Sequence, residues 1–304
     1  MARPAATAAS AVARPSSLEA AQGAGQSFWA LAWRRFLHHR VALAGGAVVL
    51  ALVLVALLAG VIAPYRFEDI DLTARLRPPS TAHLLGTDTI GHDVFTRLLY
   101  AGRVSLLVGF SAAVVAAFVG VVVGATAGFY GGAVDNVLMR ITDVSLALPD
   151  LPILIILSRY LGGSVTGIVF VISLFAWRSV ARLVRGEVLK LRGQEFTDAA
   201  RALGATDFRI LMRHLVPNAL APVIVAATLI VGGAILTEAA LSFLGIGIQP
   251  PVPSWGNMLQ NAQDFILSAP RLALYPGVMI FLVVLCFNFL GDGLRDALDP
   301  RLKL

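Results

Sequence analysis

The chain has 304 residues, of which 58% are apolar and only 14% are charged, and its mean hydropathy is +0.80. This composition excludes a soluble globular protein and predicts an all-α integral membrane protein with several spans. The formal net charge of +6 could suggest a nucleic-acid partner. However, the basic residues are spread along the segments between apolar runs, as membrane topology requires, so we expect no nucleic-acid binding.

The N-terminal region divides into three segments. Residues 1–26 are rich in Ala, Ser, Pro and Gly, which predicts a disordered tail, and no signal peptide is evident. Over 27–40, Trp33, Phe36 and neighbouring apolar residues share one helical face while arginines and histidines occupy the other, which is typical of a helix in the membrane interface. The first transmembrane helix is expected at 41–63.

Length and apolarity predict six spans in total, because about 20 helical residues cross a hydrocarbon core of about 30 Å. The expected spans are 41–63, 104–127, 141–161, 165–184, 219–241 and 272–291. With the N-terminus inside, 17 of the 24 Lys and Arg residues fall on inner segments. The excess of basic residues predicts that both termini and the segment 185–218 are cytoplasmic.

The outer segment 64–103 is expected to be an extracytoplasmic loop containing an amphipathic helix. Ile90, Val94, Phe95, Leu98 and Leu99 would form its apolar face and lead into the second span. The stretch HLLGTDTIGHDVFTRLLYAGRVSL resembles the LGTDxxGRDxxSRxxxGxRxSL signature of the dipeptide, oligopeptide and nickel branch of ABC-importer permeases. In this chain His92 and Thr96 replace the usual Arg and Ser.

Two carboxylates fall at membrane depth. Asp150 lies between two prolines in ALPDLP of the third span, and Glu238 lies in the fifth span. A carboxylate there is costly unless it faces protein or water, so each residue is a candidate for the solute pathway or for a contact between helices. Nearby, Arg140 and Asp143 are three residues apart, and we expect them to form a local ion pair.

A polar stretch from Glu195 to Pro217 interrupts the apolar spans and predicts two short helices that meet at Gly204. Phe208, Leu211, Met212 and Leu215 would share one face of the second helix, which we expect to end at Pro217. The stretch resembles the coupling motif of ABC-importer permeases, E-A-A, three residues, G, nine residues, I-x-L-P. The matching residues are Asp198, Ala199, Ala200, Gly204, Val216 and Pro217, and His214 stands where the family has Ile.

Two further signatures of the same branch follow. Residues 236–259 match E-A-x-LSFLGxGxxPPxPxWG, where the glycines and prolines predict a rigid outer loop and Trp255 is able to sit at the membrane interface. The end of the chain, LGDGLRDALDPRLKL, matches LGDxLRDxLDPR. By its own chemistry this segment is a helix end carrying Asp292, Arg295 and Asp296, and a solvated tail with internal ion pairs fits it equally well.

The chain carries no recognisable catalytic or cofactor site. A phosphate-binding loop needs G-x-x-x-x-G-K followed by Ser or Thr, and each of the two lysines, Lys190 and Lys303, follows a leucine. No HExxH or CxxC pattern indicates a metal site, and the single cysteine, Cys286, excludes an intrachain disulfide. We therefore expect no enzyme activity, metal or cofactor in this chain.

The resemblance implies a type I ABC importer transmembrane domain in a bacterial cytoplasmic (inner) membrane, with a permease core over 104–304 that includes the coupling loop 185–218. It implies a second homologous permease subunit, two cytoplasmic ATPase subunits that bind ATP, an extracytoplasmic substrate-binding protein and membrane lipid as partners. Peptides, nickel chelates and glutathione are all substrates of such systems. The alternative is an ion-coupled secondary transporter that would use Asp150 or Glu238.

Overall fold

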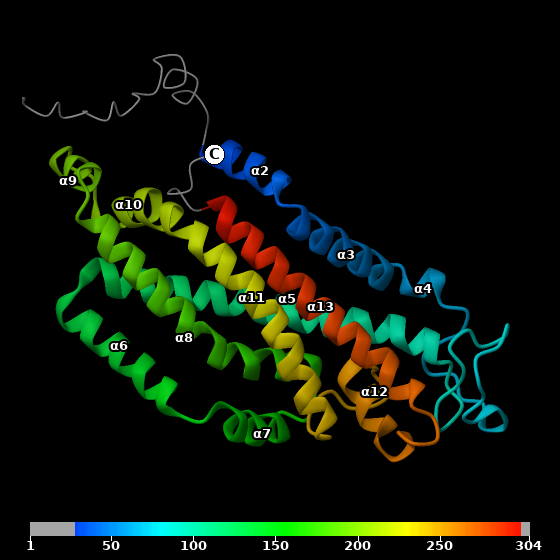
Figure 1. Ribbon diagram of the computed structural model, residues 1–304. Helices are drawn as coiled ribbons and strands as arrows, with labels where there is room; N and C mark the ends of the chain where they lie inside the picture. The colour runs from blue at the N-terminus through cyan, green and yellow to red at the C-terminus, as the bar shows by residue number, and fades with distance from the viewer. Residues whose placement is uncertain (1–27, 299–304) are drawn as a thin grey trace, which may run out of the picture.

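The computed structural model describes residues 28–298, and within this range the fold is built of helices without an extended strand (Figure 1). The predicted tail at 1–26 and the residues after Leu298 lie outside the described residues. The main helices are α2 (Phe28–His38), α3 (Arg40–Leu57), α5 (Val94–Tyr130), α6 (Gly132–Ala147), α7 (Asp150–Tyr160), α8 (Val165–Arg192), α9 (Glu195–Ala202), α10 (Asp207–Ile210), α11 (Val216–Phe243), α12 (Trp255–Ala262) and α13 (Arg271–Leu298). Short turns of helix lie at α4 (Ala59–Ile62), η1 (Leu72–Ala74), η2 (Leu211–Leu215) and η3 (Gln263–Phe265).

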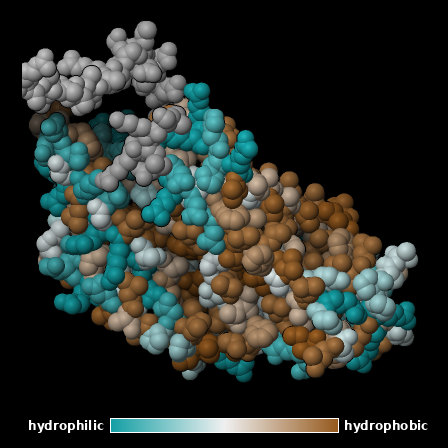
Figure 2. All heavy atoms as spheres, in the orientation of Figure 1, coloured by the Kyte–Doolittle hydropathy of each residue, from teal (hydrophilic) through white to brown (hydrophobic). Residues whose placement is uncertain are grey.

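Five helices of the described range are long and apolar enough to cross a membrane. They are Arg40–Leu57, Val94–Tyr130, Val165–Arg192, Asp207–Phe243 and Arg271–Leu298. Figure 2 shows hydrophobic residues covering the middle of the molecule, with hydrophilic residues gathered at the end that carries α9 and α10. A surface of this kind fits an apolar belt inside the bilayer and a polar end in water.

The third predicted span is not a straight helix. It consists of α6 and α7, which meet at an angle of 91° and together would make a sixth crossing. The bend falls at Leu148 and Pro149, where both residues have extended backbone angles. Proline disfavours helix in the residue before it and removes a backbone donor, so the helix ends at this point and restarts at Asp150.

Helix α5 forms the centre of the fold and packs closely along α8. Its stripe of small residues makes this approach possible, as a Cβ atom on Gly124 would overlap the carbonyl oxygen of Ala181. One turn earlier, a Cβ atom on Gly120 would lie 2.5 Å from Cβ of Val180. Helix α11 packs on α5 and on α13, and α3 packs along α13 (Figure 1). Cys286 is buried in the core between these helices.

The apolar stretch expected to form an amphipathic helix leading into the second span is the start of α5 itself, except for Ile90. Asp93 caps α5 directly by accepting a hydrogen bond from the backbone N–H of Thr96, so the apolar stretch after it forms the first turns of a 37-residue helix. Val94 is buried in the core, whereas Ile90 lies in the loop before the helix. The first predicted span also ends early, because α3 stops at Leu57 and a break separates it from α4.

Trp255 is buried in the core and does not present its side chain to a membrane interface, as the sequence allowed. Its side chain is only 1% exposed and packs against Gly102 of α5, where an added Cβ atom would lie 3.0 Å from the indole ring. The indole N–H donates a hydrogen bond of 3.2 Å to the carbonyl oxygen of Leu98. The outer loop before α12 is thereby folded onto the body, and the tryptophan fills the core with its polar atom satisfied.

Candidate coupling site and polar contacts

The turn between α9 and α10 is built on Gly204. This residue has φ +80°, a left-handed conformation that glycine adopts without strain, and the N–H of Ala205 donates to the carbonyl of Ala200 at 3.1 Å to close the helix end. A Cβ atom on Gly204 would meet nothing within 4 Å, so the backbone angle and not the space requires glycine. Thr206 then caps α10 by accepting from the N–H of Arg209 at 3.4 Å. We call α9, the Gly204 turn, α10 and η2 the coupling corner.

The inner side of the coupling corner is anchored in the body. The hydroxyl of Thr197 is buried and donates to the carbonyl of Leu191 at 2.9 Å, which ties α9 to the end of α8. Ile210, Leu211 and Leu215 are buried in a cluster that includes residues of α5 and α8. The corner is therefore packed against the transmembrane helices through buried side chains.

The side of the coupling corner that faces away from the body presents apolar residues to solvent. Leu203 is 88% exposed, Phe208 71% and Met212 50%. Asp198 and Ala199 are also exposed, and Asp198 pairs with Arg201 at 3.2 Å. An exposed apolar patch rimmed by charge is typical of a surface that a partner covers.

The second helix of the coupling corner differs from the prediction in two ways. Leu211–Leu215 is a π-helical turn, in which each residue advances less around the axis than in an α-helix, so Leu211 and Leu215 face inward while Phe208 and Met212 face outward. The helix also continues through Val216 and Pro217 into α11, because proline is tolerated in the first turn of a helix. His214 is partly buried, and its carbonyl accepts from the Asn218 side chain at 2.6 Å.

Asp150 and Glu238 both lie in contacts between helices. Asp150 at the start of α7 accepts two hydrogen bonds of 2.8 Å from Nη2 of Arg178 on α8. Glu238 on α11 is fully buried and accepts from the hydroxyls of Ser105 at 3.0 Å and Ser242 at 2.7 Å. The local pair expected between Arg140 and Asp143 is wrong, because Asp143 instead binds Arg182 at 2.6 Å.

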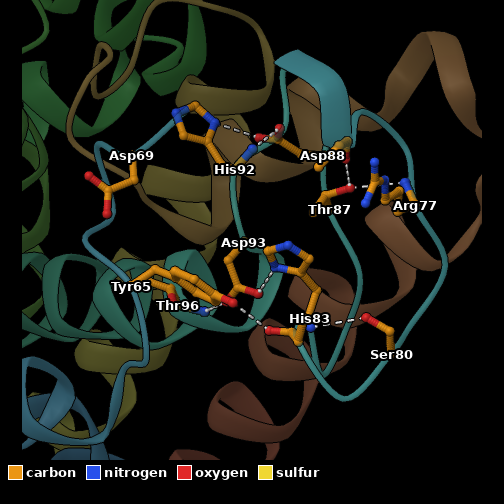
Figure 3. A network of polar contacts seen from close by, with 12 residues as sticks. Tyr65, Asp69, Arg77, Ser80, His83, Thr87, Asp88, His92, Asp93 and Thr96 are labelled. Atoms are coloured by element: carbon orange, nitrogen blue, oxygen red, sulfur yellow. Dashed lines mark hydrogen bonds and ion pairs between the residues drawn. The ribbon is translucent and has the colours of Figure 1, made fainter. Parts of the chain in front are cut away.

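The signature residues of the outer loop form a folded polar network before α5 (Figure 3). Nδ1 of His83 lies 2.9 Å from Oδ2 of Asp93, and Nδ1 of His92 lies 2.8 Å from Oδ2 of Asp88. Thr87 donates to the carbonyl of Ala74 and accepts from the N–H of Arg77 at 2.9 Å. The network holds the loop against the first turn of α5. Among the described residues, no group of three His, Cys, Asp or Glu side chains is arranged to hold a metal ion.

The surroundings of Asp88 shift its acidity. Burial raises the pKa of this carboxyl, but the hydrogen bond from His92, the charge of that ring and two backbone donors outweigh burial, so the pKa is lowered. The ionised form of Asp88 is thus the one that the loop stabilises.

Comparison with known proteins identifies the family of the chain. Residues 120–304 match the binding-protein-dependent transport system inner membrane component, and residues 27–79 match the N-terminal transmembrane domain of oligopeptide transport permease C. The chain belongs to this family of permeases. It is a multi-span permease subunit of an ABC importer, and family membership does not support the ion-coupled secondary transporter.

Two relatives match this permease over nearly its whole length. The glutathione transport system permease protein GsiD of Pectobacterium atrosepticum is 42% identical over 276 residues, which cover 90% of this chain and 92% of the relative. The dipeptide transport system permease protein DppC of Alkalihalophilus pseudofirmus is 42% identical over 275 residues, 90% of each chain. An inward-facing MetNI methionine ABC transporter structure aligns with a TM-score of 0.51 at 21% identity, over 67% of this chain and 96% of that chain, which shows a shared fold.

The structure of the permease adds ion pairs between helices that sequence reasoning missed. Three arginines on one face of α8 each bind an aspartate of the α6–α7 pair, and the pairs are Arg178–Asp150, Arg182–Asp143 and Arg185–Asp135. The spacing of four and three residues along α8 is the available signal, because it places the arginines on one helix face. Asp135 and Asp143 are eight residues apart in α6, and Asp150 follows seven residues later beyond the bend. Their spacing along the chain therefore does not show which arginine each one binds.

Proposed function

We propose that this permease subunit passes peptides, or a related small solute such as glutathione or a nickel chelate, across the cytoplasmic membrane. The named transport activities of the two relatives support this class of solute. The complete importer would contain a second homologous permease, two cytoplasmic ATPase subunits that bind and hydrolyse ATP, and an extracytoplasmic substrate-binding protein. In this assembly the present chain binds no cofactor of its own.

The coupling corner is the surface proposed to dock on an ATPase subunit. The observation that carries this assignment is the exposed apolar patch of Leu203, Phe208 and Met212 on a corner whose other side is anchored in the core. Because α9 follows α8 and α10 leads into α11, movement of the docked corner would tilt two spans together. Closing and reopening of the ATPase dimer would thereby alternate access to the solute pathway.

The same assignment implies cytoplasmic termini. Helix α2, the coupling corner and the C-terminal end of α13 lie at one end of the molecule (Figure 1). The excess of basic residues on the inner segments supports placing this end in the cytoplasm. The polar face of α2 carries Arg34 and Arg35, which suits contact with lipid headgroups.

Substitution of Gly204 by Asp tests the proposal in the assembled importer. Gly204→Asp places a side chain and a charge on a backbone with φ +80°, so uptake is expected to fall to background while membrane insertion is retained. Gly193→Asp is the matched control, since Gly193 has φ −88° and open space around its Cβ position. Undiminished uptake by Gly204→Asp, or equal loss in both variants, would contradict the coupling assignment.

A further inference from the structure

A large cavity opens at the cytoplasmic end between α8, α11 and α13. Its volume is about 740 Å³, within the range of about 300–1,000 Å³ that is usual for small-molecule sites. Helix α11 packs against both α8 and α13 and forms the base of the cavity between them.

The cavity adjoins the coupling corner. Pro217 and Asn218, at the start of α11, line it on one side, and Leu191, one residue before the end of α8, lines it on another. These two helices are the ones that the corner connects. Movement of the corner would therefore move two of the three helices that line the cavity.

The two side walls carry balanced charges. On α8, Glu187 and Lys190 are three residues apart and form an ion pair at 3.6 Å. On α13, Asp292 and Arg295 of the C-terminal signature are also three residues apart and line the same cavity. The lining thus holds two acids and two bases on facing helices.

The base of the cavity is apolar and contains a proline inside a helix. Ala221, Val225 and Ala226 present small side chains. Pro222 lies inside α11 and has no N–H to donate to the carbonyl of Asn218, the position four residues earlier. That carbonyl therefore lacks its usual donor within the helix.

We propose that this cavity is a binding site at the cytoplasmic exit of the solute pathway for a zwitterionic solute with separated ammonium and carboxylate groups, such as a short peptide. Glu187 and Asp292 bind the ammonium group, and Lys190 and Arg295 bind the carboxylate. A lipid chain fits poorly because its burial would desolvate charges on both walls. The inference rests on the proposed function, and it gives the C-terminal signature a role in solute release.

Single cysteines test this site in the assembled, nucleotide-free importer. In a Cys286→Ala background, Val225→Cys places a thiol in the cavity, and Ile224→Cys places one on the adjacent residue, which is exposed at the same depth outside the cavity. A charged, water-soluble thiol reagent reacts with the thiolate. We expect Val225→Cys to react at least about tenfold faster, because the reagent reaches the charged cavity through water, whereas Ile224→Cys would face lipid. Lipid raises the pKa of a thiol, and each unit is a tenfold change in thiolate.

Protection of Val225→Cys identifies the ligand. Dialanine is expected to slow the labelling, and N-acetyl-dialanine amide, which lacks both charges, is expected to leave it unchanged. Equal labelling of the two cysteines, failure of both to react, or labelling that dialanine does not slow would each overturn the proposal. ATPase activity stimulated by the binding protein is measured on the same samples. Its absence would mean that the proposed importer function fails, whereas stimulation without protection would reject only this site.

Discussion

Arg178 and Asp150 join three segments at the bend between α6 and α7. The side chain of Arg178 is 4% exposed, and its guanidinium binds the carboxylate of Asp150 through two hydrogen bonds of 2.8 Å. It also donates to the carbonyl of Ser145 in the last turn of α6 and to that of Phe175 at 2.6 Å on its own helix. One buried cation thus holds the end of α6 and the start of α7 against α8.

Removing the carboxylate of Asp150 should loosen the bend between α6 and α7. Asp150→Asn leaves the buried charge of Arg178 without its counterion, and we expect a loss of about 1–3 kcal/mol in the free energy of unfolding. Denaturation of the purified protein in detergent measures this loss. Asp143→Asn is the control on the same pair of helices, because both partners of the Arg182–Asp143 pair are about half exposed. We expect that control to lose less than about 1 kcal/mol, so equal losses would argue against a special role for Arg178.

Close packing of α5 on α8 gives a second prediction. Gly124→Ala would push a methyl group into the carbonyl of Ala181 and force the helices apart, at a cost of about 1–3 kcal/mol. Gly233→Ala in α11 is the matched change, since a Cβ atom there meets nothing within 4 Å. Alanine is the better helix former, so Gly233→Ala is expected to be neutral or stabilising by up to about 1 kcal/mol. Thermal unfolding followed by circular dichroism compares the two, and a stabilised Gly124→Ala would refute the packing argument.

Glu238 should stabilise the fold as a buried hydrogen-bond acceptor. Its carboxylate accepts hydrogen bonds from the hydroxyls of Ser105 and Ser242. The Ser105 hydroxyl in turn accepts from the backbone N–H of Trp255 at 3.3 Å, and the Ser242 hydroxyl accepts from the backbone N–H of Ile248 at 3.1 Å. We expect Glu238→Ala to lose about 1–3 kcal/mol of stability because buried donors lose their partner, and Glu238→Gln to lose less. Uptake by Glu238→Gln is expected to be retained. Loss of uptake in a stable Glu238→Gln protein would instead indicate a role in the solute pathway.

The sequence was sufficient to predict the spans and the family because those signals are local. Apolar length defines a span, and Gly204 with the residues around it defines the coupling turn. The 91° bend within the third span was not predicted, because apolar content does not report direction, and the signal of the bend was the Leu148–Pro149 step. The burial of Trp255 was not predicted because an aromatic residue in an outer loop suits both the interface and a buried slot. Only the position of Gly102 on α5 decides between them.

The polar contacts were harder to predict than the helices. Arg140 and Asp143 satisfy a helical ion-pair spacing, yet Asp143 binds Arg182 on another helix. Spacing along a helix shows which residues share one of its faces, but it does not show which faces of two helices are in contact. The cavity lined by Glu187 and Arg295 is likewise invisible in the sequence, since 108 positions separate its two walls in the chain.

The outer loop should lose stability in acid through Asp88. Its pKa is lowered from the ordinary value of 3.8, so the folded loop favours the ionised carboxylate. This contribution to stability is complete above the unfolded pKa, declines as pH falls below about 3.8 and is lost once pH passes the lower folded pKa. Hydrogen exchange of residues 72–93, measured between about pH 5 and pH 3, should show the loop opening more readily in acid. Asp88→Asn should open more readily already at pH 5 and respond little to further acidification. An unchanged acid response in Asp88→Asn would assign the effect to another carboxylate of the network.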